Sequence, residues 1–207
     1  MIEKVIWLID ENENESRTYA RRLKRLMPTG ILIKRIFPPY RTKKEYIDIL
    51  DDPSTACIVV DQRMKGTGEV TYSGIELAQY LRSINKKIPI YILTSFADEE
   101  HEFTGGEWSV DDIVDKGMLK DEEKAFIIKA RILRRIDVHE DLLNKRAQRF
   151  SDLLKKSLSN VLDETELQEL TELQFERTAS TLASELAEQQ ALDQIIKTNQ
   201  QLLDILS

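Results

Sequence analysis

The sequence is poor in the side chains that build disulfides and zinc centres. It has one cysteine and two histidines among 207 residues. A single cysteine cannot form a disulfide within the chain, and Cys57 lies in an apolar run, so we expect a buried core residue rather than a reactive thiol. His101 and His139 are far apart in the sequence and have no second cysteine beside them, which argues against a zinc site.

Long hydrophobic runs and an excess of positive charge are also missing. The first apolar run, Val5 to Ile9, lies between Lys4 and Asp10. It is too short for the core of a signal peptide or for a membrane span. The formal net charge of -7 opposes non-specific contact with nucleic acid or with an anionic membrane surface. We therefore expect a cytoplasmic protein that binds neither nucleic acid nor a membrane.

Short apolar runs alternate with helical patterns along the first part of the chain. The runs are rich in β-branched and aromatic residues and have the length of strands. Capping boxes that start at Thr42 and Ser73 predict two of the helices between them. Each crossover helix returns the chain to the same end of the sheet, so we expect an α/β fold with a five-stranded, parallel, doubly wound sheet. The expected strands are residues 5–9, 31–37, 56–60, 89–94 and 112–115.

Proline and glycine are absent from residue 121 to the last residue, 207, and their absence predicts long helices. An apolar 3-4 spacing from Leu133 to Val161 is typical of a coiled coil. Asp163 and Glu166 then have the spacing of a helix cap. We therefore expect a helical hairpin or coiled-coil extension that serves dimerisation or partner binding. The predicted domains are 1–120 and 121–207, and the predicted helices of the second are about 121–160 and 164–206.

Polar residues follow the predicted strands at the edge where ligands collect in a parallel sheet. Asp10 and Glu11 follow the first strand, and Asp61 follows the third. Three carboxylates held together repel one another unless a cation lies among them, and oxygen ligands suit Mg²⁺. Thr94 and Lys116 come at the ends of the fourth and fifth strands. The pattern predicts an acidic site with one ammonium group at this edge.

These positions resemble the receiver domain of two-component response regulators, over about residues 3–130. Met64 and Gly74 match further receiver positions, and DDIVDK at 111–116 is similar to the segment that ends at the receiver lysine. The resemblance implies the flavodoxin-like receiver fold. It also implies that a histidine kinase or phosphotransfer protein is a partner, and that the chain catalyses only its own phosphorylation and dephosphorylation.

The resemblance also assigns roles to the polar residues. It implies that Asp61 accepts the phosphoryl group and that Thr94 and Lys116 hold its oxygens. It implies that Asp10, Glu11 and Asp61 bind Mg²⁺, and we expect the backbone carbonyl of Arg63 to be a further metal ligand. The expected function is an Mg²⁺-dependent phosphorylation switch.

The expected output of this switch is helical and does not bind DNA. From residue 157 onward the sequence has ten acidic and two basic residues, which is unlike a DNA-recognition domain. We expect a protein partner or a second copy of the chain, as in a homodimer, to bind through the C-terminal helices.

Several residues depart from the receiver pattern and leave alternatives open. Glu11 stands where an aspartate is more usual, Gly117 where proline is usual, and Ile113 where an aromatic residue is usual. A pseudo-receiver, which binds proteins independently of phosphorylation, is therefore the alternative. A phosphatase of the haloacid dehalogenase type would need a second carboxylate two residues after Asp61, where Arg63 stands.

Two further segments carry weaker expectations. His139 lies in VHEDLL on a predicted helix, where we expect a solvated flank, with a phosphoacceptor role as the alternative. Between the fourth and fifth strands, the glycine pair at 105–106 and the lack of periodicity argue against a regular helix.

Overall fold

The computed structural model of the chain describes residues 3–66, 68, 70–99, 101, 103–159 and 161–175. The chain divides into two compact units, Met1–Arg149 and Phe150–Ser207. The predicted domain boundary after residue 120 stays a prediction, and the part of the second predicted helix from 176 to 206 lies outside the described residues.

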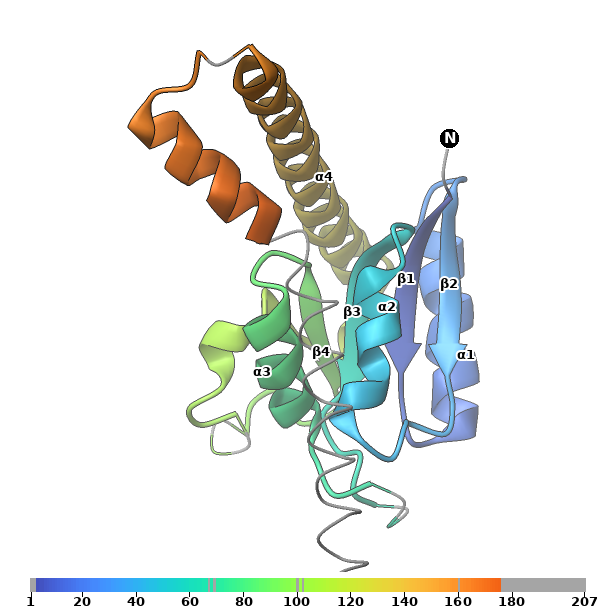
Figure 1. The fold of residues 1–207 in the computed structure, drawn as a ribbon. Helices are drawn as coiled ribbons and strands as arrows, with labels where there is room; N and C mark the ends of the chain where they lie inside the picture. Colours follow the sequence, from blue (N-terminus) through green and yellow to red (C-terminus); the bar gives the residue numbers. More distant parts are fainter. Residues whose placement is uncertain are drawn as a thin grey trace, which may run out of the picture. The chain divides into compact units, whose positions relative to one another are not determined.

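The first unit is built on one five-stranded parallel sheet, as the sequence predicts (Figure 1). The strand order is β2-β1-β3-β4-β5, so β1 and β3 lie side by side in the middle of the sheet. β3 is buried along its whole length, which explains its continuous apolar sequence. The strands are β1 (Lys4–Ile9), β2 (Ile31–Ile36), β3 (Thr55–Asp61), β4 (Ile90–Thr94) and β5 (Asp112–Asp115).

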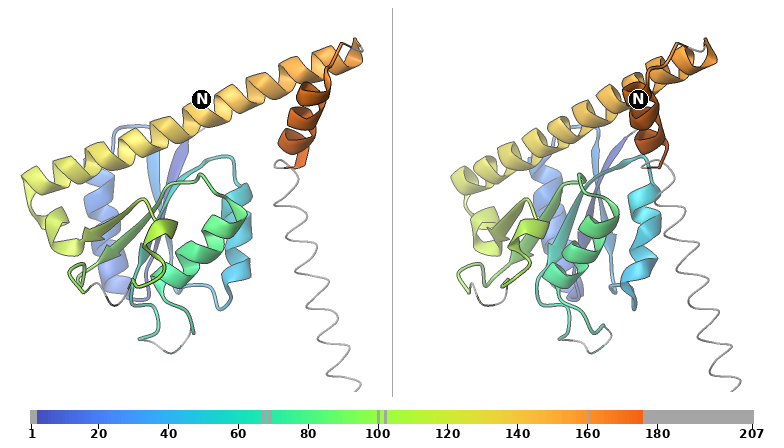
Figure 2. Two further views of the ribbon diagram at one scale, coloured as in Figure 1. Left: turned by 90° about the vertical axis from the view of Figure 1, so that its left-hand side faces the viewer. Right: turned by 60° about the vertical axis from the view of Figure 1, so that its left-hand side comes forward.

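Helices cover both faces of this sheet, which can be followed in Figures 1 and 2. One core cluster joins the sheet to α2 and α3, and the other joins it to α1 and the first part of α4. The α-helices are α1 (Glu13–Leu26), α2 (Ile47–Asp51), α3 (Gly74–Ile84) and α4 (Glu122–Leu158), and the 3₁₀ helices include η1 (Lys43–Tyr46), η3 (Glu107–Ser109) and η4 (Lys116–Lys120).

The predicted capping boxes are confirmed. The Ser73 amide donates to Glu76 Oε2 at 2.6 Å, and the Glu76 amide donates to Ser73 Oγ at 3.4 Å. The Thr42 amide donates to Glu45 Oε1 at 2.8 Å in the box that starts η1. Each box supplies partners to amide groups at a helix start that have none within the helix.

The described residues between β4 and β5 contain no α-helix. They form turns and 3₁₀ helix, as the glycine pair at 105–106 leads one to expect. A Cβ atom on Gly106 would lie 2.3 Å from Ile75 Cγ1 of α3, so only glycine allows this close approach. The described part of the segment therefore packs on α3 without an α-helix of its own.

The buried face of α4 in the first unit differs from the predicted stripe. Ile136 is buried as predicted, but Leu133 is only half-buried, Glu140 is exposed and Leu143 is 51% exposed. The buried residues share Ile136 with the predicted stripe, but Ile132 and His139 are buried one position before the predicted Leu133 and Glu140, because the rotation of the helix is set by the sheet it covers. They are Ala125, Ile128, Ile132, Ile136 and His139.

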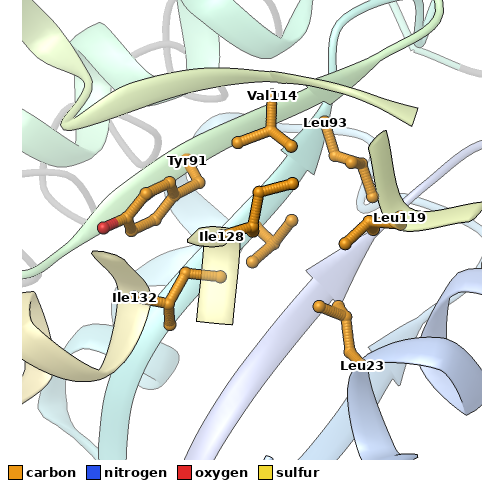
Figure 3. A pocket seen from close by; sticks show the side chains of 8 residues that line it. Leu23, Tyr91, Leu93, Val114, Leu119, Ile128 and Ile132 are labelled. Carbon is orange, nitrogen blue, oxygen red and sulfur yellow. The ribbon is translucent and has the colours of Figure 1, made fainter. Parts of the chain in front are cut away.

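A small cavity of about 10 Å³ lies between the sheet and the helices α1 and α4 (Figure 3). Apolar side chains dominate its lining, so neither its size nor its chemistry suits a polar ligand. Its lining residues are Leu23, Val59, Tyr91, Leu93, Val114, Leu119, Ile128 and Ile132.

The second unit contains the end of α4 and a helix at 164–175. Asp163 Oδ1 accepts a hydrogen bond from the Glu166 amide at 2.8 Å, which confirms the predicted cap. Lys156 Nζ lies 2.5 Å from Glu166 Oε1. Across the part of the chain that the structure describes, no helix combines the length and the apolar character needed to cross a membrane.

Candidate functional site

The carboxyl ends of β1, β3 and β4 bring polar residues to one edge of the sheet (Figure 1). Asp61 is the last residue of β3, and Asp10 directly follows the neighbouring strand β1. Lys116 follows β5 and begins η4. Parallel pairing therefore places residues from three distant parts of the sequence at the same edge, as the sequence analysis expects.

Lys116 lies between the two aspartates. Its Nζ is 2.7 Å from Asp61 Oδ1 and 3.5 Å from Asp10 Oδ2. The side chains are 5%, 9% and 1% exposed for Lys116, Asp61 and Asp10. The ion pairs are thus shielded from water. In such buried surroundings the attraction between opposite charges is strong, but the loss of hydration of the charged groups is costly.

A third carboxylate, from Glu15, completes the surroundings of Lys116. Glu15 lies in the first turn of α1, and its Oε2 is 2.5 Å from Lys116 Nζ. Its side chain is 45% exposed, so it faces the ammonium from the solvent side. Glu15 is not among the site residues predicted from the sequence. The available signal was that α1 begins at the same sheet edge, directly after the acidic pair that follows β1.

The charges of the site shift its pKa values in the directions that burial and pairing dictate. Burial raises the pKa of Asp61 to about 6, against the opposing charge of Lys116. Burial also raises the pKa of Asp10, again against Lys116. Burial alone would lower the pKa of Lys116, but the charges of Asp61 and Asp10 outweigh it and raise that pKa. Lys116 therefore stays protonated while Asp61 takes up a proton in mildly acidic solution.

Glu11 is turned toward the long loop after β3. Its Oε2 accepts a hydrogen bond from the Gly66 amide at 2.7 Å. A Cβ atom on Gly66 would lie 2.5 Å from Glu11 Oε1, so a larger residue there would require the carboxylate of Glu11 to shift. The loop is thus tied to the acidic pair after β1.

The oxygens at this edge suit a hard divalent ion by their chemistry. Asp10 and Asp61 supply carboxylates, and Mg²⁺ prefers such ligands. Their arrangement is less complete, because the ammonium of Lys116 lies between them and Glu11 bonds the loop instead. Within the described residues, no three side chains of aspartate, glutamate, histidine or cysteine are grouped so that they could hold a metal ion.

Arg63 contacts the site through its backbone. Its amide donates to Asp61 Oδ2 at 3.0 Å. Its side chain points toward the loop after β4, where Nη2 is 2.9 Å from Glu99 Oε2 and the guanidinium carbon is 3.3 Å from the centre of the Phe96 ring. The predicted role of its carbonyl group as a metal ligand stays a prediction.

Thr94 and Gly74 lie close to the end of β3. Thr94 is the last residue of β4 and follows Leu93, which pairs with Asp61. It is 1% exposed, and its Oγ1 accepts a hydrogen bond from the Phe96 amide at 3.1 Å. A Cβ atom on Gly74 would lie 2.3 Å from the Asp61 carbonyl oxygen, so glycine is required where α3 begins.

His139 does not belong to this site, and the expectation of a solvated flank is wrong. It is 7% exposed, and its Nδ1 has no hydrogen-bond partner. Burial lowers its pKa, and the charges of Arg82 and Lys87 act in the same direction. The reason is that α4 continues to pack on the first unit at this position. Asp111, whose charge also acts on His139, directly precedes β5, so His139 lies toward the sheet edge opposite Asp61.

Asp61→Asn is expected to stabilise the metal-free protein at pH 7 by up to about 3 kcal/mol, since one pKa unit corresponds to about 1.4 kcal/mol. The pKa of Asp61 is about 6 in the folded protein against 3.8 ordinarily. Its contribution to stability is therefore fully present below pH 3.8 and is lost as the pH rises through about 6. Asparagine does not titrate, so the two proteins should differ little near pH 4 and most above pH 7.

Urea unfolding followed by tryptophan fluorescence, at several pH values, measures this difference. A variant less stable than the wild type at neutral pH would show that the ion pair with Lys116 outweighs the burial of Asp61.

Comparisons with known proteins give a fold. Neither protein-family models nor curated proteins match the chain. A response regulator receiver domain protein from Clostridium thermocellum is 15% identical, with a TM-score of 0.50, and the match covers 67% of this chain and 98% of that one. A pilus assembly-related protein from Burkholderia pseudomallei is 13% identical, with a TM-score of 0.50, and the match covers 64% of this chain and 91% of that one. A response regulator from Thermotoga maritima, in complex with Mg²⁺ and BeF, is 22% identical with a TM-score of 0.46 and coverage of 61% and 97%. The chain therefore has the flavodoxin-like fold of response regulator receiver domains, followed by a long helix.

Proposed function

We propose that this protein is a phosphorylation switch of the response-regulator type, in which Asp61 accepts a phosphoryl group. The observation that carries the proposal is the ammonium of Lys116 held 2.7 Å from Asp61 Oδ1 beside the buried Asp10. A carboxylate is a nucleophile toward phosphorus, and a fixed cation next to it offsets the charge of the phosphoryl oxygens.

Each residue of the site has a proposed role. An Asp61 oxygen attacks the phosphorus of the donor, and Lys116 donates a hydrogen bond to a phosphoryl oxygen. The hydroxyl of Thr94 donates a second one, since its oxygen accepts the Phe96 amide and its hydrogen stays available as a donor. Asp10, Glu11 and Asp61, with the Arg63 carbonyl, would hold Mg²⁺, and Glu11 Oε2 accepts the Gly66 amide in the metal-free protein. The ion, when bound, neutralises charge on the transferred group.

The proposed output is the helical extension, with domains 1–120 and 121–207. Lys116 begins η4, and α4 follows η4 after a single residue, so a shift of Lys116 is passed to the start of α4. Several large apolar side chains of the second unit are exposed. Such exposure is expected of a surface that binds a protein partner or a second copy of the chain. These side chains are Leu154, Leu158, Val161, Leu167 and Phe175. We propose a cytoplasmic homodimer whose phosphodonor is a histidine kinase or phosphotransfer protein.

The test is phosphorylation of the full chain with acetyl phosphate and Mg²⁺, followed by intact mass measurement. We expect the wild type to gain one phosphoryl group and Asp61→Asn to gain none. Asp115→Asn is the matched control at the same sheet edge, because an asparagine oxygen can still accept the Gly117 amide that Asp115 Oδ1 accepts at 2.6 Å. Labelling of Asp61→Asn would contradict the assignment of the nucleophile.

A pseudo-receiver is the second candidate, favoured by one observation. Glu11 Oε2 accepts the Gly66 amide, and among the residues that the structure describes no three carboxylate, histidine or cysteine side chains are grouped so as to hold a metal ion. In that case the wild type would take up no phosphoryl group under the same conditions, and calorimetry would detect no Mg²⁺ binding.

A further inference from the structure

Lys116 has three carboxylate partners, and its ammonium group has three hydrogens to donate. The partners are Asp61 Oδ1 at 2.7 Å, Glu15 Oε2 at 2.5 Å and Asp10 Oδ2 at 3.5 Å. The donors of Lys116 are thus matched by acceptors before any phosphoryl group arrives. A phosphoryl oxygen can gain a hydrogen bond from Lys116 only if one of these carboxylates gives up its own.

The three carboxylates differ in the free energy needed to break their hydrogen bond with Lys116. Asp10 is buried, and its Oδ1 is fixed by the Asn12 amide at 2.8 Å. Asp61 is the nucleophile itself, and its Oδ2 accepts the Arg63 amide. Glu15 lies at the solvent side with its side chain 45% exposed, so water can replace the ammonium as its partner. Glu15 is therefore the partner that can leave at the lowest cost.

We propose that Glu15 occupies Lys116 in the unphosphorylated protein and yields it to the incoming phosphoryl group, which slows phosphoryl uptake. The inference rests on the proposed function. In transfer from acetyl phosphate, an Asp61 oxygen forms a bond to phosphorus, the bond from phosphorus to the acetate oxygen breaks, and acetate leaves with the electron pair. No proton is transferred. The hydrogen bond of Lys116 passes from Glu15 to a phosphoryl oxygen.

The negative charge of Glu15 also opposes the approach of the donor, which is itself an anion. Three carboxylates surround the single ammonium of Lys116, and a phosphoryl group adds further negative charge. Removing the charge of Glu15 frees Lys116 and lessens this repulsion at the same time. Glu15 thus acts as a positioning residue whose effect on the rate is inhibitory.

The test compares Glu15→Gln with Glu13→Gln. Glu13 is a matched control, because it lies in the same turn of α1, is 44% exposed and pairs with Arg17 instead of Lys116. Under sub-saturating acetyl phosphate, Glu15→Gln should take up the phosphoryl group about tenfold faster than the wild type or more, because like charges held close together disfavour binding by at least such a factor. Glu13→Gln should match the wild type.

Two readouts separate this electrostatic effect from a structural one. Raising the salt concentration should speed uptake by the wild type more than by Glu15→Gln, because salt screens the repulsion that the variant lacks. In metal-free protein, nuclear magnetic resonance of the Lys116 ammonium should show faster hydrogen exchange in Glu15→Gln than in the other two proteins.

Equal or slower uptake by Glu15→Gln, with a wild type that is phosphorylated, would overturn the inference and leave the proposed function intact. If the wild type itself takes up no phosphoryl group, the proposed function and the inference both fail.

Discussion

Lys116→Met is expected to destabilise the metal-free protein by about 3–5 kcal/mol at pH 8, because removing one partner of a buried ion pair leaves an uncompensated charge. Asp10 and Asp61 are 1% and 9% exposed at their side chains, and both are paired with this ammonium. Methionine fills a similar volume, so the loss measures charge rather than packing. Urea unfolding gives the free energy directly.

The destabilisation by Lys116→Met should depend on pH. Burial already raises the pKa of Asp61 to about 6 while Lys116 opposes it, so removing Lys116 raises that pKa further. A carboxyl group with a raised pKa in the folded state contributes stability at low pH and loses it as the pH rises through that pKa. The variant should therefore approach the stability of the wild type toward pH 4 and fall away above pH 6.

Lys120→Met is the control for this prediction. Lys120 is an exposed lysine in the same 3₁₀ helix, η4, and a surface substitution of this kind should change the stability by no more than about 0.5 kcal/mol. A loss in Lys116→Met that stays the same from pH 4 to pH 8 would show that packing, and not the charge of Asp10 and Asp61, is responsible.

The sheet and its acidic edge were predictable from the sequence because their signals are local. The strands that carry the site, β1, β3, β4 and β5, are short runs that end at or directly before a polar residue, and parallel pairing places their ends together. Asp61 and Lys116 are 55 positions apart in the sequence, yet the alternation of strands and helices suffices to predict that they meet. The capping boxes at Thr42 and Ser73 are equally local and were predicted for the same reason.

Glu15 could not be selected from the sequence, because its role depends on the rotation of α1. Glu13 and Glu15 are both acidic residues in the first turn and are almost equally exposed. Only the packing of α1 on the sheet decides that Glu15 faces Lys116, whereas Glu13 pairs with Arg17 one turn further along the same helix. The departure at Gly117 has a similar explanation. Its amide donates to Asp115 Oδ1, and proline has no amide hydrogen for this bond.

His139 was misjudged because a 3-4 pattern fixes the period of a helix but not which stripe meets the core. The exposed Glu140 fits the predicted stripe, whereas His139 lies on the stripe that the sheet covers. A polar residue on the buried stripe has no apolar signal by which it could be recognised. The charges of Arg82 and Asp111 both act on His139.

Arg82→Met is expected to destabilise the protein by about 3–5 kcal/mol, the cost of breaking a buried, hydrogen-bonded charge pair. The Arg82 side chain is 14% exposed and donates to the carbonyls of Ser109, Lys86 and Ile88 at 2.9 to 3.0 Å. Its Nη2 is 3.0 Å from Asp111 Oδ2, and Asp111 is 5% exposed. One side chain thus joins α3 to the residues before β4 and β5.

Arg131→Met is the matched control for Arg82→Met. Arg131 forms an ion pair with Asp112 at 2.9 Å, but its side chain is 56% exposed, so its loss should cost less than about 1 kcal/mol. Urea unfolding compares the two variants. The charge of Arg82 also helps to keep the pKa of His139 low, so in Arg82→Met that pKa should rise, which proton resonances of the two histidines can follow. Equal losses in the two variants, with no change at His139, would show that the buried bonds of Arg82 add nothing beyond those of a surface pair.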